Sequence, residues 1–254
     1  MELVVLGSGT SVPHPSRCSP AYWLETLGGT ILLDAGPDAA HRMAQERLDW
    51  SNLDAIWISH FHLDHFGGLP TLLFGYRWAT QTRHRTKPLR IFGPTGLRQL
   101  IQAIDNANNY KLFQQPFSLD LVEVSDGTEF EILPRVNAAV YSTPHTVESL
   151  ALRLSDESAK SFVYTSDTGY SEELTAFSAG VDLLLIECSF RSNKPVTKHL
   201  ELSDAMKIAS DCRPGRVVLT HLYPEWDAFT LSDEARGLWN GETVEAIDGL
   251  RLTI

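Results

Sequence analysis

The chain has 254 residues, of which 43% are hydrophobic and 21% charged, and its formal net charge is −11 at pH 7. This apolar content excludes a disordered chain, and the length is ample for a large core, so residues 1–254 are expected to form a single domain. The acidic balance disfavours broad nucleic-acid binding.

The first residues, the apolar runs and the cysteines bear on where the protein is located and on whether it has disulfides. The first residues, Met1 to Leu6, enter a predicted strand at once, without a basic leader, and no apolar run approaches the roughly 18 residues that a membrane span requires. We therefore expect a cytoplasmic protein without a membrane-spanning segment. Three widely spaced cysteines, Cys18, Cys188 and Cys212, predict neither a disulfide framework nor a thiolate zinc cluster, and are expected to be small buried hydrophobic residues.

Short apolar segments, many bounded by Gly, Pro or Asp, predict the strands. They cover residues 2–6, 21–26, 30–34, 55–59, 89–92, 119–124, 128–133, 136–142, 150–155, 161–165, 182–187, 216–220 and 243–247. Apolar residues at helical spacing predict helices over 95–107 and 202–210, and a helical stripe runs from Leu69 to Tyr76. Helices interleaved with two groups of strands predict an α/β fold in which two sheets pack together and helices cover the outsides.

The densest group of polar residues follows the predicted strand 55–59. There the chain reads Ser59-His60-Phe61-His62-Leu63-Asp64-His65-Phe66-Gly67-Gly68. His60 and His62 are two apart, so in extended chain their side chains point the same way, and Asp64 and His65 are expected to turn toward the same centre. Gly67-Gly68 is expected to supply the turn before the next helix.

A metal site explains this motif better than surface or satisfied core histidines do. Three neutral imidazoles and a carboxylate beside a buried strand would be costly to bury without partners, and a divalent cation satisfies all of them at once. Imidazole with carboxylate suits zinc, and also iron or manganese, better than calcium.

Three further predicted strands lead to residues that bind metals, namely His145, Asp167 and His221. A single such residue is more often a turn or capping residue. Open layered folds, however, build their sites at the carboxyl ends of strands, so four strands that end in this way favour one shared site.

Other polar residues have weaker signals. Asp34 ends the predicted strand 30–34, and we expect it to hydrogen-bond a ligand histidine rather than to bind metal directly. His199, before the 202–210 helix, is either a helix-entry residue or a general acid. The segment Arg77–Arg90 carries five cations and no acid, which favours a solvated surface loop, with a phosphate-attracting rim near the metal site as the alternative.

Taken together, the chain resembles the metallo-β-lactamase-fold hydrolases, and within them the ribonuclease Z-like branch. The resemblance covers nearly the whole chain and implies a four-layer αββα sandwich with a dinuclear metal site along one edge. It rests on segments in the family's order: Leu6–Pro13, Ile31–Pro37, the His60-x-His62-x-Asp64-His65 core, Gly67–Pro70, Ile91–Pro94, Ser166–Thr168 and Leu219–His221.

Carried over by position, the resemblance implies seven ligands for two divalent ions, with zinc favoured and manganese or iron as alternatives. His60, His62 and His145 would hold one ion, Asp64, His65 and His221 the other, and Asp167 would bridge them. A hydroxide that bridges the ions would attack phosphorus. Asp64 and His199 are the residues expected to act in the reaction, His199 as the proton donor, and the cap of the helix that follows is expected at Ser203.

One departure from the family bears on the substrate. Transfer-RNA-processing members carry a long arm where only 22 positions separate His145 from Asp167. With this departure, the resemblance implies a metal-dependent phosphodiesterase for a small phosphodiester or an RNA end, and a homodimer because relatives often pair. Hydrolysis of an ester, thioester or lactam on the same site, or metal binding without catalysis, are the alternatives.

Overall fold

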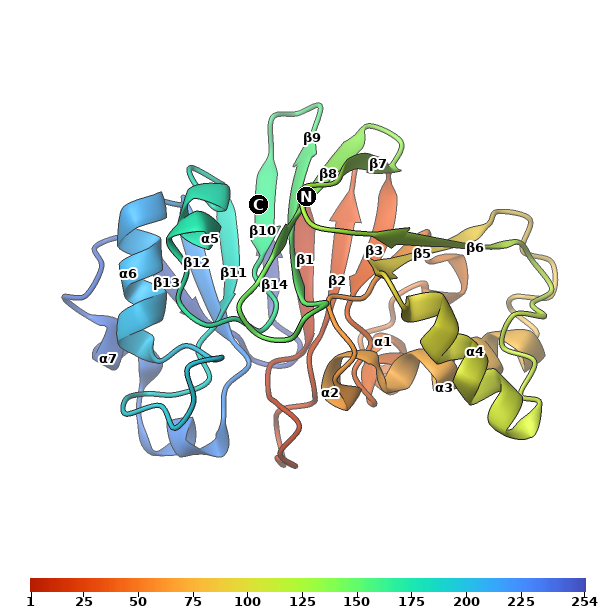
Figure 1. Cartoon of the computed structure of the whole chain (residues 1–254), viewed down its shortest axis with the longest axis horizontal. Helices are drawn as coiled ribbons and strands as arrows, with labels where there is room; N and C mark the ends of the chain where they lie inside the picture. The colour runs from red at the N-terminus through yellow and green to blue at the C-terminus, as the bar shows by residue number, and fades with distance from the viewer.

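The structure, a computed structural model, describes residues 1–254. Two seven-stranded sheets pack face to face, with helices on both outer sides (Figure 1). This arrangement confirms the predicted αββα sandwich. All of the predicted strands are present.

The first sheet has the strand order β14-β1-β2-β3-β4-β5-β6. Strands β1 to β3 are antiparallel, β3 to β6 are parallel, and β14 pairs antiparallel with β1. The bounds are β1 Glu2–Gly7, β2 Ala21–Thr26, β3 Gly29–Leu33, β4 Ala55–Trp57, β5 Leu89–Pro94, β6 Leu119–Val124 and β14 Arg251–Thr253.

The second sheet has the order β13-β12-β11-β10-β9-β8-β7. Strands β7 to β10 are antiparallel, and β10 to β13 are parallel. The bounds are β7 Glu129–Leu133, β8 Val136–Ser142, β9 Leu150–Asp156, β10 Ser161–Tyr164, β11 Leu183–Glu187, β12 Arg216–Thr220 and β13 Glu242–Glu245.

Seven α-helices and two 3₁₀ turns connect the strands. Helices α5 and α6 lie beside β10 to β12, and α1, α3 and α4 lie beside the first sheet (Figure 1). The bounds are α1 Ala39–Gln45, α2 Leu63–Phe66, α3 Gly68–Trp78, α4 Leu97–Asn108, α5 Glu172–Phe177, α6 Leu202–Cys212 and α7 Leu231–Ala235, with 3₁₀ turns at Trp50–Asn52 and Pro224–Ala228.

Three apolar clusters fill the spaces between the four layers. In β1, Leu3 and Val5 face the other sheet, whereas Val4 and Leu6 face the helices of the first outer layer. All four are fully buried, and a strand covered on both faces reads as a continuous apolar run. The third cluster packs α6, through residues such as Met206, against the second sheet.

The predicted cap of α6 at Ser203 is wrong. The N-cap is Glu201, and the Asp204 carboxylate accepts a hydrogen bond from the Glu201 main-chain N–H at 3.3 Å. The Ser203 hydroxyl instead donates to the Glu201 carboxylate at 2.8 Å. The Glu201 side chain and the main chain of Asp204 make the reciprocal contact, which completes a capping box. The loop that carries His199 therefore ends at a well-defined helix start.

The basic segment Arg77–Arg90 is largely engaged within the fold. Arg85 is buried and donates to four main-chain carbonyl groups. Lys87 forms an ion pair with Asp54 at 2.7 Å, and Arg90 donates to a main-chain carbonyl of β7 at 2.9 Å. These contacts favour a structural role over a phosphate-attracting rim.

Two further expectations concern membrane-spanning segments and the cysteines. None of the helices combines the length and apolar character that a membrane span needs. Cys188 and Cys212 are buried and Cys18 is half-buried, and all three are free thiols.

Candidate metal centre

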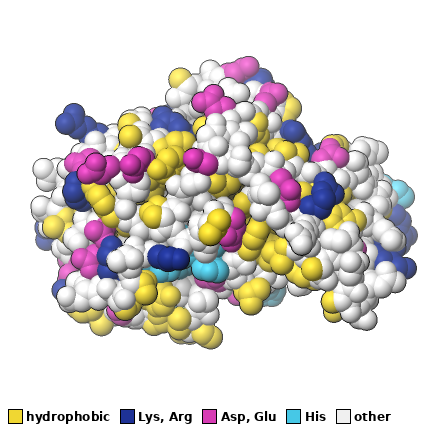
Figure 2. Space-filling model, in the orientation of Figure 1, with side chains coloured by type: hydrophobic (Ala, Val, Ile, Leu, Met, Phe, Trp, Pro, Cys, Tyr) yellow, Lys and Arg dark blue, Asp and Glu magenta, His cyan; other side chains and the backbone are white.

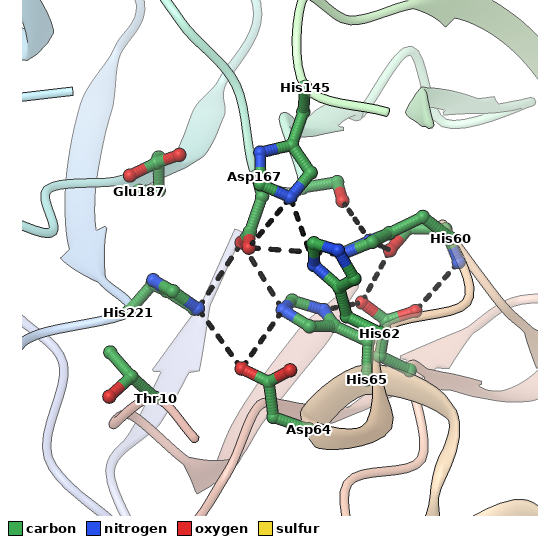
Figure 3. A network of polar contacts seen from close by, with 12 residues as sticks. Thr10, His60, His62, Asp64, His65, His145, Asp167, Glu187 and His221 are labelled. Atoms are coloured by element: carbon green, nitrogen blue, oxygen red, sulfur yellow. Dashed lines mark hydrogen bonds and ion pairs between the residues drawn. The ribbon is translucent and has the colours of Figure 1, made fainter. Parts of the chain in front are cut away.

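The seven predicted ligands meet at one edge of the sandwich, where strands of both sheets end (Figure 3). Four follow β4 of the first sheet, and the others follow β8, β10 and β12 of the second. They form two groups whose ligand atoms lie within 4.8 Å of one another: His60, His62, His145 and Asp167 in one, and Asp64, His65 and His221 in the other.

The His-rich motif changes from extended chain to helix over a few residues. His62 has extended backbone and is the N-cap of α2, which carries Asp64 and His65 on its single turn. The predicted turn is confirmed at Gly67, a single turn residue between α2 and α3, whereas Gly68 already begins α3. Gly68 also allows close approach, since a Cβ there would lie 2.1 Å from the carbonyl oxygen of Gly36.

Asp167 lies between the two groups. Its Oδ1 is 3.2 Å from His65 Nε2 and 3.4 Å from His221 Nε2. Its Oδ2 is 3.6 Å from His145 Nε2 and 3.8 Å from His60 Nε2. Each carboxylate oxygen thus faces a different pair of imidazoles.

The outer nitrogen of four site histidines is hydrogen-bonded to the surrounding chain, which fixes the tautomer. His65 Nδ1 donates to Asp34 at 2.7 Å, and His145 Nδ1 donates to the main-chain carbonyl of Lys198 at 2.9 Å. Serine hydroxyls accept from the other two, Ser59 from His60 at 3.0 Å and Ser189 from His221 at 2.9 Å. In the neutral form of each of the four rings, Nε2 is therefore the atom that has a lone pair.

These lone pairs supply the test of whether a metal fits. The Nε2 atoms of His60, His65 and His221 are buried and have no hydrogen-bond partner. Orphaned buried nitrogens of this kind are costly unless something satisfies them. Three such atoms, aimed at the same space as two carboxylates, match the donor set of a divalent transition metal.

Asp34 makes the hydrogen bond to a candidate ligand that the sequence predicts. It is fully buried, and besides His65 its carboxylate accepts from the Ser59 main-chain N–H at 2.7 Å, the Ser59 hydroxyl at 2.8 Å and the Tyr164 hydroxyl at 2.7 Å. The Asp34–His65 contact therefore belongs to a fully satisfied buried network, which holds the imidazole in one orientation.

The electrostatics of the site favour added positive charge. Burial alone would raise the pKa of Asp167, but the imidazoles of His221 and His65 hold it well below its usual range. Burial would lower the pKa of His65, yet the carboxylates of Asp167 and Asp34 raise it well above its usual value. The pKa of His60 is lowered well below its usual value by burial. The buried carboxylates of Asp167 and Asp34 thus stabilise positive charge beside them, whereas burial favours a neutral His60, the form that binds a metal ion.

Left-handed backbone marks three strand ends at the site. Asp34 after β3, Ser166 near the end of β10 and His221 after β12 have φ of 55°, 57° and 56°. Non-glycine residues adopt this conformation rarely, and it clusters at functional sites. Here it turns the chain sharply at the point where the side chains must face the shared centre.

Glu187, at the end of β11, is a site residue that the sequence analysis missed. It is buried, and its carboxylate accepts from His199 Nδ1 at 3.0 Å and from the Ser189 hydroxyl at 2.5 Å. Because Ser189 in turn accepts from His221, one carboxylate orients two site histidines. The signal was present, since Leu183–Ile186 is another apolar strand that ends in an acid.

His199 therefore lies beside the site rather than merely at a helix entry. Burial would lower its pKa, but the hydrogen bond from its ring to Glu187 raises it. His199 also forms a group with Asp167 and His221 whose polar atoms lie within 4.8 Å of one another.

The site is open to solvent. His62 is exposed, and histidine side chains reach the surface near the middle of the face shown in Figure 2. The short interval between His145 and Asp167 is taken up by the antiparallel pair β9 and β10, so no arm projects from it.

Comparisons with known proteins agree with this geometry. Residues 29–222 match the family model described as the beta-lactamase superfamily domain. The probable metallo-hydrolase YhfI of Bacillus subtilis is 26% identical over 252 residues, which cover 98% of each chain. A ribonuclease Z of Shouchella clausii is 27% identical over 279 residues, which cover 87% of this chain and 86% of that protein. The crystal structure of the short form of human tRNase Z has a TM-score of 0.80 at 22% identity, covering 100% of this chain and 99% of that one, a likeness of fold alone.

Proposed function

Because the chain belongs to the beta-lactamase superfamily and resembles metal-dependent hydrolases within it, we propose that it is a phosphodiesterase that works with two divalent metal ions. The observation that carries the proposal is the position of Asp167, whose two carboxylate oxygens face different groups of histidines. A carboxylate placed in this way serves two ions, and paired ions suit displacement at phosphorus. Support for a phosphodiester substrate comes from the relatives named ribonuclease Z.

The ligand assignment follows the two groups in the structure. His60, His62 and His145 would hold one ion, Asp64, His65 and His221 the second, and Asp167 both. Imidazole and carboxylate donors without a thiolate favour zinc, with manganese or iron as alternatives. When bound, the ions supply an acidified water as the nucleophile and neutralise charge on the phosphoryl oxygens.

The chain's own residues position the groups that react. Asp64 Oδ2 lies 3.6 Å from His221 Nε2 and 3.8 Å from His65 Nε2. Its Oδ1 is left to accept a hydrogen bond from the attacking water and so to orient it. His199 is held by Glu187 through Nδ1, which leaves Nε2 to donate a proton to the leaving oxygen.

The proposed substrate is a small phosphodiester or an RNA end. The site is open, no arm projects between His145 and Asp167, and Arg85, Lys87 and Arg90 are bonded within the fold. These features leave few groups that could bind a long polyanion. The expected single domain, homodimer and cytoplasmic location stay predictions.

Metal loading combined with substrate turnover tests the proposed function. Metal-free protein supplied with zinc or manganese is expected to bind two ions per chain and to hydrolyse bis(p-nitrophenyl) phosphate. A protein that bound two ions and left this diester intact, but hydrolysed a thioester or a lactam, would contradict the phosphodiesterase proposal. One that bound two ions and hydrolysed none of the three would favour a non-catalytic metal-binding protein.

His199→Ala is expected to slow hydrolysis mainly for substrates with poor leaving groups. General acid catalysis contributes about 10²–10⁴-fold, and it matters most when the leaving oxygen is a strongly basic alkoxide. We expect a loss of about a hundredfold or more in kcat for alkyl leaving groups, and a much smaller loss for p-nitrophenolate, measured over a series of diesters. Equal losses across the series would remove the proton-donor role. His84→Ala, which changes a histidine outside the site, is the matched control.

A further inference from the structure

The candidate ligands come from two separate sheets, so the site exists only when the sheets hold one relative position. His60, His62, Asp64 and His65 belong to the first sheet's side, whereas His145, Asp167 and His221 belong to the second. The space between the sheets is filled by apolar side chains, which specify contact but not direction. Directional bonds between the sheets near the site would therefore set its geometry.

Two buried tyrosines make such bonds. Tyr164, on β10 of the second sheet, donates from its hydroxyl to Oδ2 of Asp34, which follows β3 of the first sheet, at 2.7 Å. The same carboxylate oxygen accepts from His65 Nδ1 at 2.7 Å. The Tyr164 hydroxyl is thus one residue removed from a candidate ligand on the opposite sheet.

Tyr22 makes the reciprocal connection. It lies on β2 of the first sheet, and its hydroxyl is 2.8 Å from Oγ1 of Thr220 on β12 of the second sheet. Thr220 directly precedes His221, whose backbone is left-handed. The rings of Tyr22 and Tyr164 lie 5.2 Å apart at 60°, so the two cross-sheet bonds adjoin each other.

We propose that Tyr22 and Tyr164, the tyrosine pair, are positioning residues that lock the two halves of the metal site together across the sandwich. Their hydroxyls bond to Thr220 and Asp34, neither of which is a candidate ligand. Tyr164 fixes the Asp34 carboxylate, and through it the His65 ring, while Tyr22 fixes the strand end that presents His221. The inference rests on the proposed metal binding, but not on the identity of the substrate.

Zinc affinity of tyrosine-to-phenylalanine variants tests this role. Tyr164→Phe and Tyr22→Phe remove only a hydroxyl, and Asp34 keeps three other donors in the Tyr164 variant. We expect Tyr164→Phe to weaken zinc binding about tenfold, the lower end of the effect of losing a ligand's own hydrogen-bond partner, because it loosens the Asp34 carboxylate that holds His65. The double variant is expected to bind zinc more weakly still. The measurement is competition with a chromophoric chelator, alongside thermal unfolding of each metal-free variant.

Tyr76→Phe is the matched control. Tyr76 is equally buried, and its hydroxyl donates to the carbonyl of Trp50 at 2.6 Å, but it lies on α3, in the helical layer. It should unfold at a lower temperature, as the site variants do, and bind zinc like the wild type. Thr220→Val removes the hydrogen-bond partner of Tyr22 and leaves both tyrosines intact. Its zinc affinity therefore tests the Tyr22–Thr220 bond without a change to either tyrosine.

The outcomes separate the two proposals. Zinc affinity in Tyr164→Phe and Thr220→Val within twofold of the wild type would overturn the positioning role, whatever the change in unfolding temperature. Weaker zinc binding in the site variants, with Tyr76→Phe unchanged, would support it even if no phosphodiester were hydrolysed. A wild type that bound no zinc would overturn both proposals.

Discussion

Replacing Asp167 by asparagine is expected to lower kcat/KM for bis(p-nitrophenyl) phosphate by about a thousandfold or more. Both oxygens of Asp167 face imidazole nitrogens, at 3.2 to 3.8 Å, so the carboxylate is the one group shared by the two ligand sets. An amide keeps the shape but removes the charge and turns an NH₂ group toward the metal space. A metal ion supplies several kcal/mol of charge stabilisation, and each 1.4 kcal/mol or so is a factor of ten in rate.

Kinetics and metal content measured on the same sample check this prediction. The matched control is Asp182→Asn, because the Asp182 carboxylate accepts hydrogen bonds from Ser161 and lies outside the site. The control should keep its metal and its activity. An Asp167→Asn protein that held two ions and stayed within tenfold of the wild-type activity would contradict the bridging assignment.

Removing the metal is expected to lower the unfolding temperature by roughly 10 °C. A ligand present at about a thousand times its Kd stabilises the folded state by about 4 kcal/mol, and in a chain of about this size each kcal/mol shifts Tm by about 2–4 °C. The stability is lost because the buried carboxylates and the orphaned Nε2 atoms have no partner once the ion leaves.

Thermal scans with EDTA, and again after zinc is restored in excess, measure this shift. His14→Ala is a suitable control, since the ion pair of His14 with Asp227 lies outside the ligand groups. That variant should keep the zinc-dependent shift, whereas Asp167→Asn should lose most of it. Equal unfolding temperatures with EDTA and with zinc, in a wild type shown to bind the metal, would contradict the prediction.

The sequence predicts most of the fold because local pattern and burial agree. The apolar run of β1 and the helical stripe of α3 each reflect faces that are covered in the structure. The last strand, β14, was not predicted, because two of the three residues of Arg251–Thr253 are polar and the segment becomes a strand only by pairing with β1. Tertiary pairing of this kind leaves little trace in a local pattern.

The residues of the candidate site likewise divide into those that a local sequence pattern predicts and those that only the tertiary structure brings together. His145, Asp167 and His221 could be predicted because each follows an apolar strand, and the structure brings all three beside the His-rich motif. Glu187 also ends an apolar strand. It was not recognised as a site residue because no histidine or second acid lies beside it in the sequence. The bond between Tyr22 and Thr220 joins residues 198 positions apart, and nothing in either segment alone indicates it.

The left-handed backbone of Asp34, Ser166 and His221 has a consequence for protein engineering. Each such residue costs about 1–2 kcal/mol, a notable share of a total stability of roughly 5–15 kcal/mol. Glycine at His221 would relieve this strain only by deleting a candidate ligand. Glycine at Asp34 would leave four buried hydrogen-bond donors without their acceptor, which costs more than the strain that it relieves. Selection for heat resistance and selection for turnover should therefore conflict at His221 and agree in keeping Asp34.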